Sequence, residues 1–150
     1  MEIYGKPDVV NNMPMENEGG EILLPAAFGF IHNRGYGEKA VLSDLSEEAY
    51  IVNWVDGGTR LEYMFEVKEP GSFSLMIDAA SETNSIELNI QLDDQDYPFE
   101  LKGSKDLSKF EDSKLGEIQI AKSGSNVMIL KAGFAPWNQL KLRSIRLVRK

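Results

Sequence analysis

The sequence predicts an all-β protein, an antiparallel β-sandwich of jelly-roll type, and three observations carry that prediction. Strand-like segments recur along the chain, turn residues separate them, and the main helix-like signal is the short stretch 43–50. Many short strands divided by turns are typical of sandwiches and jelly rolls. An apolar run begins at Glu21, and the strands expected after it are Tyr50–Trp54, Leu61–Val67, Ser72–Ala79, Ser85–Leu92, Tyr97–Leu101, Leu115–Ala121, Asn126–Lys131 and Leu140–Val148.

Alternation of apolar residues gives these strands an inner face, because residues two apart on a strand point the same way. The clearest set is Leu61, Tyr63, Phe65 and Val67. The segments 72–79 and 85–92 repeat the pattern. In the last strand the apolar parity changes between Leu142 and Ile145, so a β-bulge is expected near residues 143–144.

The first 20 residues differ from the rest of the chain. They are polar, contain Pro14 and a pair of glycines, and show no periodicity. We therefore expect residues 1–20 to be a linker or poorly ordered tail and residues 21–150 to form one sandwich module.

The composition excludes several classes of partner. The chain has 150 residues, and its formal net charge is -8. Nucleic-acid binding and adhesion to anionic membranes both need clustered Lys and Arg, so neither is expected. The absence of cysteine excludes disulfides and thiolate chemistry.

Catalysis by this chain is not expected. His32 is the only histidine and lies where a strand runs into a loop, and no common nucleophile, zinc or phosphate-loop motif is present. The run Asp93-Asp94-Gln95-Asp96 offers oxygen ligands for calcium, but it lies between two strands, where Asp favours turns. A turn is the preferred interpretation, and no cofactor is predicted.

The two tryptophans lie beside turns and leave two interpretations open. Trp54 precedes Asp56-Gly57-Gly58, and Trp137 lies in the loop sequence AGFAPWNQ. An indole ring there could stack on the apolar face of a sugar while Asn138 binds hydroxyl groups. Each ring could instead cap an open end of the sandwich core.

The stretch NWVDGGTRLEYMFEVKEPGSFSLMIDAAS resembles the family-6 type carbohydrate-binding modules. The residues that fit the pattern of that family are Trp54, Val55, Asp56, Gly58, Tyr63, Pro70, Gly71 and Phe73. The ending also fits in outline, with LGEIQIAKSGSNVMILKAG followed by LKLRSIRLV. The resemblance implies a galactose-binding-like jelly roll that accompanies a glycoside hydrolase.

A second likeness lies at the front of the chain. The segment EIYGK, followed by a linker and ILLPAA, is similar to the junction between the catalytic domain and the C-terminal sandwich of family-29 α-L-fucosidases. This resemblance implies a fucosidase-like parent enzyme located in the periplasm or outside the cell.

The chain also departs from the family-6 pattern. Arg60 stands where the second aromatic of the sugar cleft is expected, and Lys141 stands near the position of a sugar-binding Asn. Of the acidic calcium ligands, only Glu21 remains near the first strand, so calcium is not favoured. The predicted ligand-binding residues are Trp54, Arg60, Trp137, Asn138 and Lys141.

Two functions remain open from the sequence. The first is a non-catalytic carbohydrate-binding or accessory domain of a glycoside hydrolase. The alternative is a structural domain that packs on the catalytic domain of its parent and binds no glycan of its own.

Overall fold

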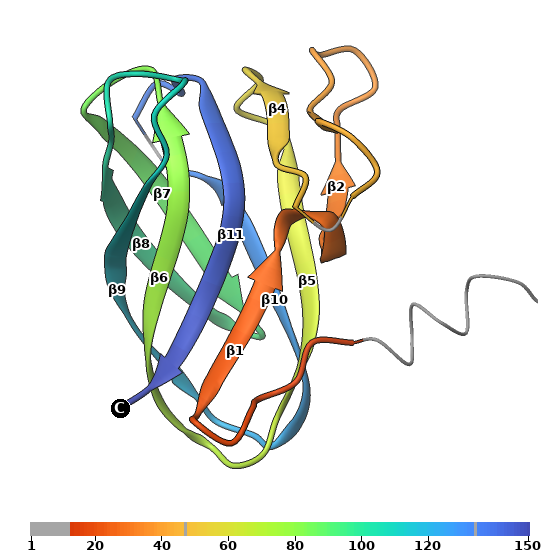
Figure 1. The fold of residues 1–150 in the computed structure, drawn as a ribbon, viewed down its shortest axis with the longest axis vertical. Coiled ribbons are helices and arrows are strands. Elements are labelled where there is room, and N and C mark those ends of the chain that lie inside the picture. The colour runs from red at the N-terminus through yellow and green to blue at the C-terminus, as the bar shows by residue number, and fades with distance from the viewer. Residues whose placement is uncertain (1–12, 47, 134) are drawn as a thin grey trace, which may run out of the picture.

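A computed structural model describes residues 13–46, 48–133 and 135–150 and confirms the all-β fold (Figure 1). Two antiparallel sheets pack face to face. The six-stranded sheet has the order β3-β4-β11-β6-β9, with β1 also paired to β11, and the five-stranded sheet has the order β2-β5-β10-β7-β8. The strands are β1 (Glu21–Pro25), β2 (Phe30–His32), β3 (Val41–Leu42), β4 (Ile51–Trp54), β5 (Arg60–Val67), β6 (Gly71–Ser81), β7 (Ser85–Leu92), β8 (Gln95–Lys102), β9 (Glu111–Ile120), β10 (Gly124–Ala132) and β11 (Leu140–Arg149).

The apolar run that begins at Glu21 serves both sheets. Its first part forms β1, the 3-10 turn Ala26–Phe28 follows, and β2 then joins the opposite sheet. The helix-like stretch 43–50 forms no helix in its described residues. None of the described helical segments is long and apolar enough to cross a membrane.

The core lies between the sheets and contains the residues that the alternation predicts. Tyr63, Phe65 and Phe73 are fully buried, as are the aliphatic residues that share their parity on β5, β6 and β7. The predicted bulge in the last strand is confirmed, because the register between β11 and β6 shifts between Leu142 and Ser144. This extra residue explains why the buried face changes parity along β11.

The N-terminal segment joins the sandwich earlier than the sequence indicated. Residues 1–12 lie outside the described residues, but the Glu66 N–H donates to the Pro14 carbonyl at 2.8 Å and the Glu16 N–H donates to the Glu66 carbonyl at 3.2 Å. This segment covers a part of β5 that β2 does not reach, since β2 pairs only with residues 60–62. Residues 13–20 are therefore part of the module and not a free tail.

A buried ion pair holds the same segment to the last strand. The side chain of Glu16 is only 4% exposed, and Arg149 donates to both of its carboxylate oxygens, at 2.7 and 2.8 Å. The Arg149 guanidinium also donates to the carbonyls of Glu69 and Pro70. It thus ties together the N-terminal segment, the β5–β6 loop and β11.

Candidate functional site

Trp54 is a core residue, and this corrects its prediction as a sugar platform. It is 1% exposed and pairs with Leu140 across β4 and β11. The ring of Trp137 lies over it with the two centroids 5.2 Å apart, and the Trp137 indole N–H donates to the Trp54 carbonyl at 3.0 Å. The pair caps the sandwich, so no ring face of Trp54 is open to a ligand.

Two of the other predicted site residues, Arg60 and Lys141, do not join the tryptophans in one site. Arg60 pairs with His32 on the outer face of the five-stranded sheet. Lys141 lies on β11 of the other sheet, with its ammonium 5.9 Å from the centroid of the Tyr50 ring. Asn138 is half-buried in the loop beside Trp137. The five residues therefore occupy the core, one loop and two opposite faces.

An exposed tyrosine that the sequence reasoning missed lies in the loop between β2 and β3. Tyr36 is 82% exposed, and the Arg34 guanidinium lies over its ring at 4.9 Å from the centroid. Arg34 also pairs with Asp56, whose side chain is 6% exposed, and this contact lowers the pKa of the Asp56 carboxyl. The ion pair fixes the loop and leaves much of the Tyr36 ring accessible.

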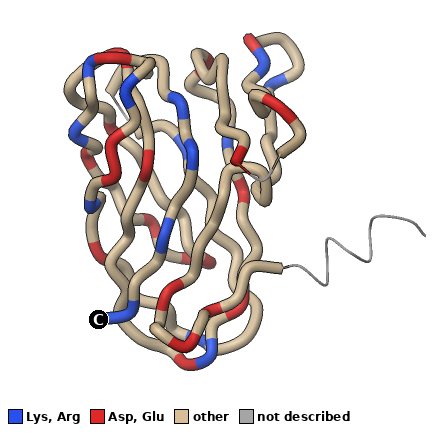
Figure 2. Tube along the Cα trace, viewed as in Figure 1, with Lys and Arg blue, Asp and Glu red and all other residues tan. Residues whose placement is uncertain are grey.

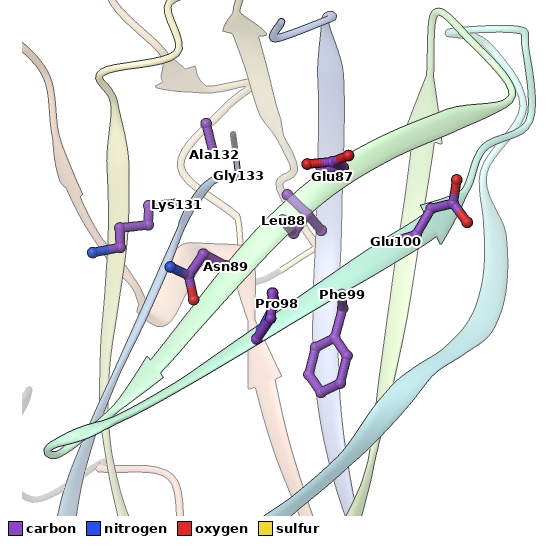
Figure 3. Close-up of a pocket in the computed structure, with 9 residues that line it drawn as sticks. All are labelled: Glu87, Leu88, Asn89, Pro98, Phe99, Glu100, Lys131, Ala132 and Gly133. Atoms are coloured by element: carbon purple, nitrogen blue, oxygen red, sulfur yellow. The ribbon is translucent and has the colours of Figure 1, made fainter. Parts of the chain in front are cut away.

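The outer face of the five-stranded sheet carries an open depression of about 780 Å³ (Figure 3). Because Leu88 and Ile90 are buried, the residues between and beside them on β7 point outward. The depression is lined by Glu87, Leu88, Asn89, Pro98, Phe99, Glu100, Lys131, Ala132 and Gly133.

Asn89 lies in the middle of this depression (Figure 3). Its side-chain oxygen is buried and has no hydrogen-bond partner among the described residues. On the neighbouring strand, the Lys131 ammonium donates to the Gln91 side-chain oxygen at 3.2 Å. An amide with free acceptor capacity beside an ammonium group can bind a hydroxylated ligand.

One rim of the depression is the loop that follows β10. The Gly133 N–H donates to the Glu87 carbonyl at 3.0 Å, and the Ala135 N–H donates to the Glu87 carboxylate at 3.1 Å. A Cβ on Gly133 would lie 2.8 Å from the Glu87 Cβ, so only glycine allows this approach. The Trp137 loop is therefore anchored to the edge of the depression.

A row of side chains extends from the depression across the whole sheet, and we call it the polar row. Register pairs His32 with Arg60, Lys131 with Asn89, and Asn89 with Pro98. Leu61 pairs with Leu130 at the end of the β5–β10 ladder. Because the two strands are antiparallel, Arg60, which precedes Leu61, lies opposite Lys131, which follows Leu130. Five strands about 4.8 Å apart give the row a length of about 19 Å. The polar row consists of His32, Arg60, Lys131, Asn89 and Pro98.

The residues left from the family calcium pattern do not fit a metal ion. The Glu21 carboxylate accepts a hydrogen bond from Arg146 at 3.1 Å, and Arg146 also pairs with Asp112. Figure 2 shows basic residues spaced along β11, and Arg146 is one of them. A guanidinium group thus supplies the positive charge beside Glu21. At the other candidate, Asp93 and Asp94 form a tight turn between β7 and β8, as predicted.

The chain belongs to the family described as a domain of unknown function, DUF5077, whose model matches residues 38–142. No curated protein matches it.

Several solved structures share the fold. A family 35 carbohydrate-binding module from Clostridium thermocellum superimposes with a TM-score of 0.69 at 14% identity, over 87% of this chain and 98% of that one. The family 35 module of Cellvibrio japonicus Abf62 gives 0.63 at 13% identity, over 85% and 92%. A Podospora anserina mannanase that contains a family 35 module gives 0.63 at 15% identity, over 89% of this chain and 28% of that one. Identities this low show the fold alone.

Proposed function

We propose that this chain is a non-catalytic carbohydrate-binding module that accompanies a glycoside hydrolase and holds a glycan on the outer face of the five-stranded sheet. The observation that carries the proposal is the open depression of about 780 Å³, lined mainly by outward-pointing side chains of three adjacent strands. It is wide and open, and polar and apolar groups share its lining, a mixture that suits the hydroxyl groups and C–H faces of a sugar chain.

The chemistry of the depression fits a sugar. The Asn89 amide nitrogen and the Lys131 ammonium can donate hydrogen bonds to hydroxyl groups. The Asn89 oxygen is buried and has no partner among the described residues, and it can accept a hydrogen bond once the side chain turns toward a ligand. Pro98, which is exposed on the same face as Asn89, provides apolar surface for the C–H face of a pyranose ring. The polar row, about 19 Å long, has room for more than one ring.

The kinds of protein that share the fold support this proposal. Two of them are separate carbohydrate-binding modules of nearly the same extent, and a third is a mannanase that carries such a module. We extend the proposal to a fucosidase-like parent enzyme in the periplasm or outside the cell, on the likeness of EIYGK and ILLPAA to the family-29 junction.

A specific observation also favours the alternative of a packing domain. Phe30 is 46% exposed and Met64 39% exposed, and both point outward on the same sheet. Met15 is 61% exposed and forms a bridge with Glu66, which lies two residues after Met64 on β5. These side chains could be buried by a catalytic domain of the parent protein.

The test is a glycan array probed with the purified chain, followed by titration of each hit against Asn89→Ala. Because the Asn89 oxygen has no partner in the part of the chain that the structure describes, the variant should fold normally and lose at least about fivefold in affinity. Asn84→Ala, an exposed loop position, is the matched control and should bind normally. Loss of binding with Tyr36→Ala but not with Asn89→Ala would move the site to the loop end. Absence of any glycan hit would overturn the proposal in favour of packing.

A further inference from the structure

We infer that the polar row recognises a carboxylate on the glycan, seated between Arg60 and Lys131. This inference rests on the proposed function and names its ligand class, a glycan that contains a uronic acid. The observation behind it is a pair of adjacent cations for which the described part of the chain provides no carboxylate partner.

The geometry places the two cations on neighbouring strands. β5 and β10 pair through Leu61 and Leu130, and Arg60 and Lys131 each stand one residue further on, at the same end of the ladder. Both point away from the core, because Leu61 and Leu130 are buried. Like charges at directly opposed positions destabilise a sheet. Figure 3 shows the Lys131 side chain extending from β10 on the side opposite to Asn89.

The neighbouring carboxylates are engaged elsewhere. Glu62 contacts the His32 ring at 2.8 Å, Glu87 accepts the Ala135 N–H, and Glu100 accepts hydrogen bonds from Ser85 and Lys102.

Within the described residues, Arg60 forms no ion pair, and the Lys131 ammonium donates to a neutral amide, that of Gln91. The arginines of β11 differ. Arg143, Arg146 and Arg149 are each paired with at least one carboxylate.

A carboxylate would relieve the repulsion between Arg60 and Lys131 and use both kinds of donor. The guanidinium can bind its two oxygens through parallel hydrogen bonds, while the ammonium acts as a point charge. The His32 ring lies opposite Arg60 in the same row and contacts Glu62. Glu62, Glu87 and Glu100 border the row, and the chain has a net charge of -8, so a densely charged polymer is disfavoured. The ligand that fits is an acidic sugar within a largely neutral glycan.

The experiment compares matched pairs of oligosaccharides that differ only in a carboxylate, glucuronic acid against glucose and galacturonic acid against galactose, by calorimetric titration at low salt. We expect the acidic member to bind about tenfold more tightly or better. Arg60→Gln should reduce that preference about tenfold while the affinity for the neutral member changes little. Lys131→Gln should also reduce the preference about tenfold, and it should weaken the neutral member as well, because Lys131 lines the depression. A sulfated counterpart, included as a third arm, should bind less tightly than the carboxylate.

The controls are Arg143→Gln and Lys141→Gln, which remove the same charge from the opposite sheet and should keep the preference. The inference fails if the neutral sugar binds equally well, or if the preference survives in both test variants. In that case the proposed function stands, provided that Asn89→Ala still weakens binding of the neutral sugar. If no sugar binds at all, the inference and the proposed function fail together.

Discussion

Replacing Trp54 by alanine should lower the free energy of unfolding of the sandwich. The side chain is 1% exposed, and removal of a buried Trp typically costs about 3–5 kcal/mol. The Trp137 ring loses its neighbour at 5.2 Å, which adds about 0.5–1.5 kcal/mol. Since Trp137 is held by its indole hydrogen bond to the Trp54 carbonyl, it cannot easily fill the gap. We expect a loss of about 4–5 kcal/mol, a large fraction of the roughly 5–15 kcal/mol that stabilises a domain.

Urea denaturation followed by far-ultraviolet dichroism measures this effect. With a slope of about 2 kcal/mol per molar urea, a loss of 4 kcal/mol lowers the midpoint by about 2 M. Trp137→Ala is the control. It removes a half-buried ring and one hydrogen bond, so it should cost only about 1–2 kcal/mol.

The reasoning about Trp54 is refuted by one combination of results. If Trp54→Ala loses less than about 1 kcal/mol, far below the usual cost of a buried tryptophan, yet no longer binds a glycan that the parent chain binds, Trp54 is a sugar platform. In that case the buried cap is not the state that acts in solution.

Three further predictions concern stability. Tyr63→Phe should raise the free energy of unfolding by about 1 kcal/mol in urea denaturation, because the buried hydroxyl has no partner among the described residues. Arg149 lowers the pKa of Glu16, so this ion pair stabilises the fold above the ordinary value of 4.5 and is lost as pH falls below it. Glu16→Gln should therefore flatten the melting temperature between pH 6 and 3. A chelator should leave the melting temperature unchanged, since Arg146 already provides the positive charge beside Glu21.

The strands could be predicted because their signals are local. Alternation at Leu61–Val67 and turn residues such as Asp93-Asp94 act over a few positions, and the structure keeps both. The bulge in β11 could also be predicted, since a change of apolar parity requires an extra residue. The boundaries of β7, Ser85–Leu92, are those expected, whereas β9 begins at Glu111, four residues before the expected Leu115.

The site could not be predicted because it depends on which strands become neighbours. Arg60 and Lys141 each precede a buried leucine near the start of a strand. The sequence around each residue does not indicate that the two strands join different sheets. Asn89 and Lys131 are 42 positions apart and meet only through the register of β7 and β10. Tyr36 lies in a loop without periodicity, where its exposure depends on the contact of Arg34 with Asp56.

Glycan binding and domain packing can share the outer face of the five-stranded sheet because they use different rows of it. The polar row crosses the sheet at Arg60 and Asn89. Phe30 pairs with Glu62 in the next outward-facing row, which is further from the Trp137 loop than the polar row is. Met64 pairs with Val127 one row beyond that. Successive outward positions on a strand are about 6.6 Å apart. A catalytic domain docked over Phe30 and Met64 would therefore border the polar row and form one wall of a deeper groove, which the isolated chain presents as an open depression.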